Sequence, residues 1–290
     1  MKRIKLGMVG GGQGAFIGAV HRIAARIDDR YQLLAGALSS DSDRAAVSAA
    51  ELGIKADRSY DSFEEMAKAE AARPDCIDAV SIVTPNHLHA DAAVAFLEAG
   101  IHVICDKPLS VSRAEGLRIK QCLQKSSAQF FLTHNYTGYP LIREARDMVA
   151  NGKLGNIRVV QAEYAQDWLA EPLETTGQKQ ASWRTDPKAT GGGGAIGDIG
   201  THAYNLVHYV TGLEAQELAS DLTSYVPGRT VDDNAHIWLR YEGGAKGQLW
   251  ISQVAVGNEN ALRLRIYGDK GGLEWEQENP NILWFTPLGG

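Results

Sequence analysis

Residues 7–22, GMVGGGQGAFIGAVHR, decide the fold that we expect of this chain. The segment that leads into the glycines, IKLGMVG (4–10), is a short and nearly continuous apolar run, which is typical of a strand buried on both faces. The segment that follows, AFIGAVHRIAARI (15–27), carries apolar side chains at helical spacing. The glycine-rich stretch between them is therefore either a surface turn or a loop shaped to hold a phosphate group.

The alternation of strand and helix continues through the first half of the chain. Apolar strands are expected at 31–40, 77–84, 101–108 and 128–136, and helices at 43–54, 86–100 and 112–125. Short strands that alternate with helices pair in parallel through right-handed crossovers. The sequence therefore predicts a doubly wound α/β domain over residues 1–136.

The pattern changes near Tyr139 and Pro140. A helix is expected at 141–155, and a strand follows at 157–168. Residues 235–255 and 261–277 alternate apolar and polar side chains around glycine turns, which predicts antiparallel hairpins. We expect residues 137–290 to form an α+β domain with a large, mostly antiparallel sheet that has one face covered and one face open.

Composition excludes several function classes. The 290 residues carry a formal charge of −6, whereas a nucleic-acid-binding protein is expected to show a net basic face. We expect no membrane span, since no apolar run approaches the roughly 20 residues that a span needs. Cys76, Cys105 and Cys122 are widely spaced, which favours reduced thiols in a cytoplasmic protein and gives no support for a metal site.

The glycine stretch fits the dinucleotide-binding pattern G-x-G-x-x-A through Gly10, Gly12 and Ala15. In this interpretation Gly10 allows the tight turn, Gly12 lets the backbone approach a pyrophosphate, and Ala15 lets helix and sheet pack closely. The helix N-terminus then faces the anion. Because a buried strand precedes the pattern and a helix follows it, residues 1–136 are predicted to be a Rossmann dinucleotide-binding domain.

The second strand leaves the choice between NAD and NADP open. An NAD site usually has an acid at the end of this strand, but Ser39 and Ser40 stand there, and Asp41 comes one or two places later. The two serines with Arg44 nearby suit a 2′-phosphate. Asp41 either reaches the ribose hydroxyl or caps the next helix.

Two further motifs follow parallel strands, where the ligands of such sheets bind. TPNHLH (84–89) is predicted to line the cofactor or to cap a helix. In CDKP (105–108), Lys107 ends a strand at its carboxyl end, where partial desolvation suits it to exchange a proton with a hydroxyl or a ketone. The alternative is an ordinary solvated lysine.

The second half contains GGGGAIGDIGTHAYNLVHYV (191–210). Asp198 and His202 are four residues apart, so on a helix they share a face, and a carboxylate beside an imidazole suits a proton relay. The alternative is a capping aspartate and an ordinary helix histidine. Five other residues near or in this half carry hydroxyl, amide, guanidinium or indole groups that suit a polyol or sugar: Asn135, Tyr136, Trp168, Trp183 and Arg184. Core packing explains the two tryptophans equally well.

With GGGQGAFIG, TPNHLH, DKP and GDIGTH in this order, the sequence resembles the Gfo/Idh/MocA family of oxidoreductases along essentially its whole length. The resemblance implies an NAD(P)-dependent dehydrogenase that moves a hydride between nicotinamide and a ring hydroxyl or ketone of a sugar, glycoside or inositol. It implies that Lys107, Asp198 and His202 act on the substrate hydroxyl, with either Lys107 or His202 as the base. The expected cofactor residues, for NAD(H) or NADP(H), are Gly10, Gly12, Gln13, Gly14, Ala15, Phe16, Ser39, Asp41, Thr84, Asn86, His87, Asp106 and Lys107. The expected substrate residues are Asn135, Tyr136, Trp168, Trp183, Arg184 and His202.

The sequence departs from the family pattern at two points. Asp106 stands where the family usually has Glu before Lys-Pro, and its side chain is one methylene shorter. The chain also stops at FTPLGG (285–290), several tens of residues earlier than most relatives, so a terminal sheet element or a pocket segment is expected to be missing.

Two other functions fit the same scaffold. One is a non-catalytic regulator or binding protein that depends on the dinucleotide, and the other is a glycosidase that uses bound NAD. The open sheet face predicts a homodimer or homotetramer.

Overall fold

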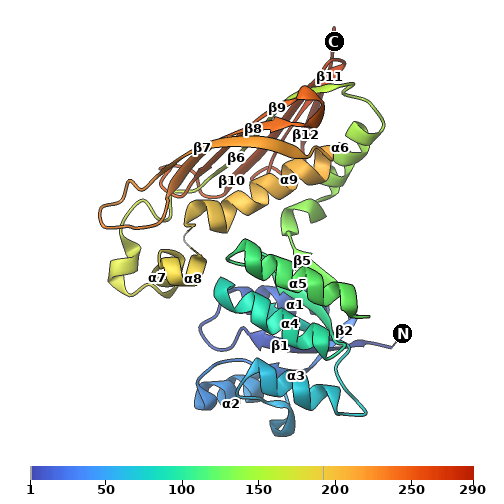
Figure 1. Ribbon diagram of the computed structural model, residues 1–290, viewed down its shortest axis with the longest axis vertical. Helices are drawn as coiled ribbons and strands as arrows, with labels where there is room; N and C mark the ends of the chain where they lie inside the picture. Colours follow the sequence, from blue (N-terminus) through green and yellow to red (C-terminus); the bar gives the residue numbers. More distant parts are fainter. Residues whose placement is uncertain (1, 192) are drawn as a thin grey trace. The chain divides into compact units, whose positions relative to one another are not determined.

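The structure is a computed structural model that describes residues 2–191 and 193–290, and it divides into two compact units, residues 1–133 and 134–290 (Figure 1). The sequence analysis placed this boundary three residues later, after Tyr136. The difference has a simple cause, because the Tyr136 ring packs into the hydrophobic core of the second unit.

The first unit is built on a five-stranded parallel sheet in the order β2-β1-β3-β4-β5. Its strands are β1 (Ile4–Gly10), β2 (Tyr31–Ala37), β3 (Ala79–Val83), β4 (His102–Asp106) and β5 (Phe130–Thr133). All five residues of β3 are buried, as expected of a strand inside a parallel sheet. The doubly wound α/β fold predicted from the sequence is confirmed.

Helices connect these strands. They are α1 (Ile17–Ile27), α2 (Ser42–Glu51), α3 (Phe63–Ala71), α4 (His89–Glu98) and α5 (Arg113–Lys125), with short 3₁₀ turns η1 (Ala56–Arg58) and η2 (Asn86–Leu88). Serine caps begin two of them: Ser62 accepts a hydrogen bond from Glu65 N, and Ser112 accepts one from Glu115 N. Helix α4 packs on β3, β4 and α5, and Phe96 on α4 is fully buried in that core.

The strand order fixes where a ligand of this unit can bind. The connection from β1 to β2 runs in one direction across the sheet, and the connection from β2 to β3 runs back in the other. With right-handed crossovers, the connecting helices then lie on opposite faces of the sheet, which leaves a crevice at the carboxyl ends of β1 and β3. Gly10 pairs with Val83 at these two ends, so the glycine loop and TPNHLH border the same crevice.

A buried histidine ties the turn after β3 to the turn after β4. His89 is fully buried at the start of α4, with Nδ1 2.7 Å from the carbonyl oxygen of Pro108 and Nε2 3.1 Å from that of Thr84. Burial lowers the pKa of His89, although both carbonyl contacts raise it. The ring is therefore neutral near pH 7, and we assign its single proton to Nδ1, the nitrogen with the shorter contact.

The second unit is built on a seven-stranded sheet in the order β12-β11-β10-β6-β9-β8-β7. Its strands are β6 (Ile157–Ala165), β7 (Ala215–Thr223), β8 (Asn234–Tyr241), β9 (Lys246–Ser252), β10 (Ala261–Gly268), β11 (Gly271–Glu276) and β12 (Leu283–Pro287). Neighbouring strands pair antiparallel except β6 with β9, which are parallel. The predicted mostly antiparallel sheet and its two hairpins, β8–β9 and β10–β11, are confirmed.

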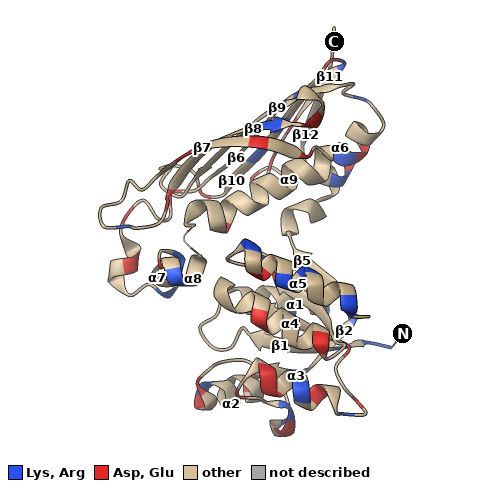
Figure 2. Ribbon diagram, viewed as in Figure 1, with Lys and Arg blue, Asp and Glu red and all other residues tan. Residues whose placement is uncertain are grey.

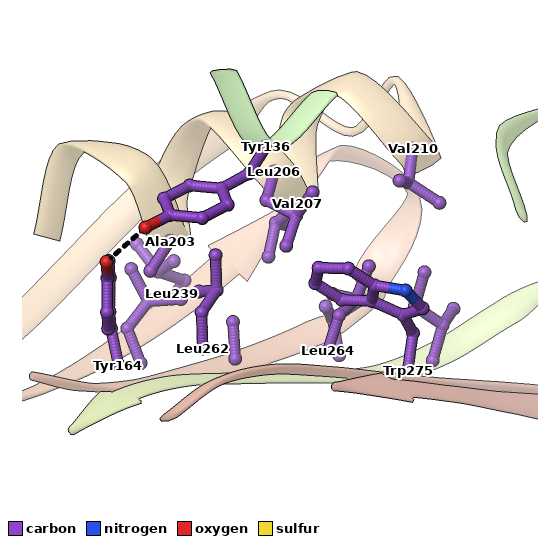
Figure 3. Close-up of a cluster of buried hydrophobic side chains, with 14 of the residues drawn as sticks. Tyr136, Tyr164, Ala203, Leu206, Val207, Val210, Leu239, Leu262, Leu264 and Trp275 are labelled. Carbon is purple, nitrogen blue, oxygen red and sulfur yellow. Dashed lines mark hydrogen bonds between the residues drawn. The ribbon is translucent and has the colours of Figure 1, made fainter. Parts of the chain in front are cut away.

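Helices cover one face of this sheet. The unit contains α6 (Pro140–Ala150), α7 (Lys179–Arg184), α8 (Pro187–Thr190) and α9 (Thr201–Thr211), with short turns η3 (Asn135–Gly138), η4 (Leu173–Thr176), η5 (Ile196–Gly200) and η6 (Glu242–Gly244). Helix α9 lies over β6 and β10, and Figure 3 shows Leu206 and Val207 above Leu262 and Leu264 of the sheet. Trp275 is fully buried in the same core, where its indole nitrogen donates to the carbonyl of Pro280 at 3.1 Å.

Charged residues of both signs are interspersed along each unit (Figure 2). Among the helices of residues 2–191 and 193–290, none combines the length and the apolar character that crossing a bilayer requires.

We predict that His89 makes the protein less stable in mild acid. Below pH about 6.5, the unfolded chain binds a proton at this ring that the folded protein does not bind, so the free energy of unfolding falls as the pH falls. Urea unfolding at pH 7.5 and 5.5 measures this fall. The variant His89→Gln is expected to be less stable at pH 7.5 by about 1–3 kcal/mol, because a buried carbonyl loses its donor. The slope of its unfolding free energy against pH is also expected to be smaller, by up to about 1.4 kcal/mol per pH unit.

The exposed neighbour His87 provides the control, since His87→Gln should keep the pH dependence of the unaltered protein. Equal pH dependence in the His89 variant and the unaltered protein would contradict the assignment of a buried neutral ring.

Candidate functional site

The loop after β1 has the backbone of a phosphate-binding turn. Gly10, Gly11 and Gly14 have positive φ angles of 77°, 75° and 76°, a region that side chains rarely allow. A Cβ atom on Gly10 would lie 2.9 Å from the carbonyl oxygen of Val83 on β3. Arg22 on α1 supports the loop from behind, because its Nη1 donates to the carbonyl of Gly11 at 2.8 Å.

A residue that the sequence motif does not mark allows the helix and the loop to pack closely. Ala15 lies before α1, whereas a Cβ atom on Gly18, inside the helix, would lie 2.4 Å from the Cα atom of Gly11. Gly18 is therefore the helix residue with no room for a side chain, and close packing of helix and sheet through Ala15 stays a prediction. Gly12 also has no room, because its Cβ atom would lie 2.7 Å from the carbonyl oxygen of Leu38.

Two predicted cofactor residues of this loop are exposed and differ in their contacts. Gln13 donates from its backbone to Ser48 Oγ at 3.0 Å and from its side chain to Glu51 Oε1 at 2.6 Å, so α2 holds it. Phe16 stands at the start of α1 with 68% of its surface exposed. Both remain predicted cofactor residues.

The structure shows the role that Asp41 has within the chain. Its Oδ1 accepts a hydrogen bond from Arg44 N at 2.8 Å, so it caps α2. Its own backbone N–H donates to Ser39 Oγ at 3.1 Å, so the two predicted ribose-binding residues are joined. Of the two roles that the sequence left open for Asp41, the capping role is present in the structure.

At the end of β3, Thr84 has a polar atom suited to a ligand. Within the described residues its buried Oγ1 has no hydrogen-bond partner, and its Cγ2 is 3.1 Å from where a Cβ atom of Gly10 would lie. Asn86 is buried and His87 is exposed on the 3₁₀ turn that follows. The sequence analysis expected a helix from residue 86, but α4 begins only at His89, after this turn.

Asp106 does not depend on the cofactor for its partners. Its Oδ1 accepts from Thr133 Oγ1 at 2.9 Å and lies 3.6 Å from Nε2 of His21 on α1, whose Nδ1 contacts Ser81 Oγ at 2.8 Å. Burial raises the pKa of Asp106, but the contact with His21, the charge of Lys107 and the Thr133 hydroxyl together hold that pKa below its ordinary value. Asp106 is therefore ionised next to the charge of Lys107, which is half-buried at the end of β4 and joined to Pro108 by a cis peptide bond.

The residues at the crevice fit a dinucleotide. Gly10, Gly11 and Gly14, in left-handed conformation, leave their positions in the loop without side chains, as close approach of a pyrophosphate requires. A buried hydroxyl at Thr84 can bind a polar group of the ligand.

In the second unit, Asp198 lies on η5, which is a single π-helical turn that leads into α9. Its Oδ2 accepts from Arg184 Nε at 3.1 Å and from Gln253 Nε2 at 3.0 Å. The sequence analysis assumed an ordinary helix from Asp198 to His202, but the chain changes from π to α geometry between them. Such π turns are frequent at functional sites.

His202 packs among aromatic rings that surround the start of α9. Its ring centroid lies 4.8 Å from that of Tyr136, 5.5 Å from that of His134 and 6.1 Å from that of Tyr164. The hydroxyl groups of Tyr136 and Tyr164 are 2.5 Å apart (Figure 3). Tyr164 also donates to Asn260 Oδ1 at 2.7 Å. Burial raises the pKa of Tyr164, and Tyr136 and the charge of Asp198 raise it further, so this hydroxyl keeps its proton.

The predicted substrate residues separate into two groups. The guanidinium carbon of Arg184 lies 5.8 Å from the ring centroid of Trp168 and 4.1 Å from that of Trp183. Tyr136 is only 8% exposed, and its hydroxyl is bonded within the core, so the structure does not support a direct contact with substrate. Asn135, one residue earlier, is exposed and keeps its predicted role.

Sequence reasoning missed several residues of both sites. Tyr164 and Gln253 lie outside the motifs that were singled out, and His89 and His134 lie inside such motifs but were not chosen as site residues. Gln253 had one usable signal, because Ser252 and Gln253 break the alternation of β9 with two adjacent buried polar residues. The partners of His89 are both carbonyl oxygens, which no sequence pattern marks.

Comparison with known proteins places both units in one family. Residues 4–134 match the family described as "Oxidoreductase family, NAD-binding Rossmann fold", and residues 142–274 match "GFO/IDH/MocA C-terminal domain". An oxidoreductase from Sinorhizobium meliloti is 54% identical, with a TM-score of 0.91 over 100% of this chain and 76% of the other.

The names of two further relatives indicate a substrate. An inositol dehydrogenase homolog from Azotobacter vinelandii, solved with NAD+, is 37% identical with a TM-score of 0.96, over 100% of this chain and 75% of the other. Levoglucosan dehydrogenase from Pseudarthrobacter phenanthrenivorans is 29% identical over 98% of this chain and 76% of the other. The chain belongs to the Gfo/Idh/MocA family of oxidoreductases, with an NAD-binding Rossmann unit followed by the family's C-terminal domain.

Proposed function

We propose that this protein oxidises a ring hydroxyl group of a cyclic polyol or sugar with NAD+ and catalyses the reverse reduction. The observation that carries the proposal is the second unit's group of a fixed carboxylate, Asp198, and a histidine, His202, one turn apart, in a chain whose first unit is an NAD-binding Rossmann domain. The relatives support the substrate class, since the Azotobacter homolog was solved with NADH and myo-inositol and levoglucosan dehydrogenase with NADH and levoglucosan.

The residues of the first unit would hold the cofactor. The glycine loop would bind the pyrophosphate, the end of β2 with Ser39 would border the ribose, and the turn with Thr84, Asn86 and His87 would line the remaining part of the dinucleotide. Bound NAD+ supplies the hydride acceptor at C4 of its nicotinamide ring.

Lys107 and His202 act on the substrate oxygen in this proposal. His202 takes the hydroxyl proton as the carbon–hydrogen bond breaks, and the carboxylate of Asp198 stabilises the protonated imidazole. Lys107 donates a hydrogen bond to the same oxygen and stabilises the charge that develops there.

The first test is turnover with the two substrates that the relatives indicate. Purified protein with NAD+ and either myo-inositol or levoglucosan is expected to produce NADH, followed by its absorbance. Absence of NADH with these compounds and with a wider panel of inositols, hexoses and glycosides, under conditions where NADH binding is measured, contradicts the proposal.

We predict that Lys107→Met lowers kcat/KM by about 10²–10⁴-fold, the range for loss of a group that handles a proton or its charge. Folding should be retained, with an unchanged near-UV spectrum. Lys120→Met, at an exposed position of α5, is the matched control and should keep full activity. A Lys107 variant with normal turnover would remove Lys107 from the mechanism.

We predict that the charge of Asp41 does not set the choice between NADH and NADPH, because its carboxylate caps α2. Asp41→Asn keeps a capping oxygen and should leave the ratio of the two dissociation constants within about twofold, while Asp41→Ala should cost about 1 kcal/mol of stability. Fluorescence titration and urea unfolding measure both effects. A shift of tenfold or more towards NADPH in Asp41→Asn would show that the carboxylate binds the ribose hydroxyl.

We infer, as a further part of this proposal, that the protein is a homodimer or homotetramer through the outer face of the seven-stranded sheet. This face exposes Trp238 (57%) and Tyr267 (42%), and it also carries the ion pair of Arg265 with Glu163 at 3.2 Å. Light scattering should give twice or four times the mass of one chain, and Trp238→Arg should lower it. A monomer at micromolar concentration contradicts this inference.

A cytoplasmic location remains a prediction from the three cysteines.

A further inference from the structure

The carboxylate of Asp198 is held by two donors from different parts of the second unit. Arg184 on α7 and Gln253, which follows β9, both donate to the same oxygen, at 3.1 Å and 3.0 Å. Gln253 is 2% exposed, and the side chains of Arg184 and Asp198 are 21% and 13% exposed. Hydrogen bonds from a guanidinium and an amide favour the ionised form of a carboxylate and fix its direction.

Arg184 is itself fixed by neighbours on its own side. Its Nη1 donates to Gln180 Oε1 at 2.6 Å and to the Gln180 carbonyl at 3.3 Å. Its guanidinium carbon lies 4.1 Å from the centre of the Trp183 ring, a cation–π contact. These contacts with Gln180 and Trp183 orient the guanidinium towards Asp198.

Hydrogen bonds also hold the backbone of the turn that carries Asp198. Asp232, in the loop between β7 and β8, accepts from Gly194 N at 2.7 Å with one carboxylate oxygen and from Ile196 N at 2.8 Å with the other. Asp198 N then donates to the Gly194 carbonyl at 3.0 Å. A Cβ atom on Gly194 would lie 2.0 Å from the carbonyl oxygen of Asp232, so only glycine fits there.

We propose that Arg184 and Gln253 are positioning residues, which hold the carboxylate of Asp198 ionised and in one direction, and that Arg184 serves Asp198 rather than the substrate. This replaces the substrate-binding role expected of Arg184 from its sequence. The proposal rests on the proposed function for its catalytic consequence, because a fixed anion at Asp198 is what stabilises a protonated His202.

The titratable groups around Asp198 come from several elements. Arg184 approaches from α7 and His202 follows on α9. From β6, the hydroxyl of Tyr164 feels the charge of Asp198. Asp232 binds the backbone of the same turn. Of these groups, Arg184 is the permanent cation, so its removal is expected to change the titration of Asp198 most.

Carbon-13 NMR tests the proposal without requiring turnover. The protein is labelled at aspartate carboxyl carbons, and the Asp198 signal is identified by its loss in Asp198→Asn. Arg184→Met is expected to raise the pH at which Asp198 titrates by about 1 pH unit or more, because an adjacent cation has been removed. Gln253→Met is expected to raise it by less. Arg263→Met, at the outer sheet face, is the matched control and should leave it unchanged.

An unchanged titration of Asp198 in a folded Arg184→Met protein overturns the proposal. If that variant does not fold, Gln253→Met and Arg184→Lys decide the matter. Lys keeps the charge but not the directed Nε donor, so Arg184→Lys should change the titration pH of Asp198 less than Arg184→Met does.

Kinetics separate this proposal from the proposed function. With whichever of myo-inositol and levoglucosan the unaltered protein oxidises, Arg184→Met should lower kcat at least tenfold and leave KM within about threefold. A raised KM with normal kcat means that Arg184 binds substrate, and this overturns the positioning role. If the unaltered protein oxidises neither these two compounds nor any of the wider panel, the proposed function fails, and the NMR titration still decides whether Arg184 and Gln253 hold Asp198.

Discussion

The first unit depends on a contact that leaves no space for a side chain. A Cβ atom on Gly18 would lie 2.4 Å from the Cα atom of Gly11, and one on Gly10 would lie 2.9 Å from the carbonyl oxygen of Val83. Helix, loop and sheet can therefore approach one another only where glycine stands. The glycine loop can then border the crevice at the carboxyl ends of β1 and β3, together with the turn at Thr84.

The polar groups around this crevice are bound to one another across the unit. His89 contacts the turns after β3 and β4, and Asp106 joins β4 to Thr133 on β5 and to His21 on α1. The crevice is thus bordered by turns whose positions are fixed by buried hydrogen bonds. A dinucleotide can then bind with little loss of conformational entropy in these turns.

The sequence alone predicted the fold well because the fold depends on repeated, local patterns. Apolar runs that alternate with helices mark a parallel sheet, and glycine turns between alternating strands mark hairpins. Motifs also mark Lys107, Asp198 and His202, which stay predicted site residues. Their partners were not found, because a hydrogen bond between Asp198 and Gln253 joins residues 55 positions apart.

Three details of the sites show the same limit. The motif counts positions from Gly10 and marks Ala15, but the helix residue with no room for a side chain is Gly18. The side chains of Arg184 and Tyr136 suit a substrate, but no motif predicts their hydrogen bonds to Asp198 and Tyr164. The spacing of Asp198 and His202 was interpreted on an α-helix, and the chain contains a π turn there.

In the second unit, the carboxylate of Asp198 and the imidazole of His202 have different surroundings. Asp198 is held by cationic and amide donors, which favour its charge, while His202 lies against aromatic rings, one of them the protonated Tyr164. Groups whose environments differ in this way can divide the roles of a proton relay between them.

The central claim is that hydride passes from a ring carbon of the substrate to the nicotinamide. The most direct test uses myo-inositol and levoglucosan that carry deuterium on every ring carbon, incubated with the protein and NAD+, and mass spectrometry of the recovered dinucleotide. The account predicts NADH that is heavier by one deuterium. Unlabelled NADH, or consumption of a deuterated compound with no labelled NADH at any time, would contradict it.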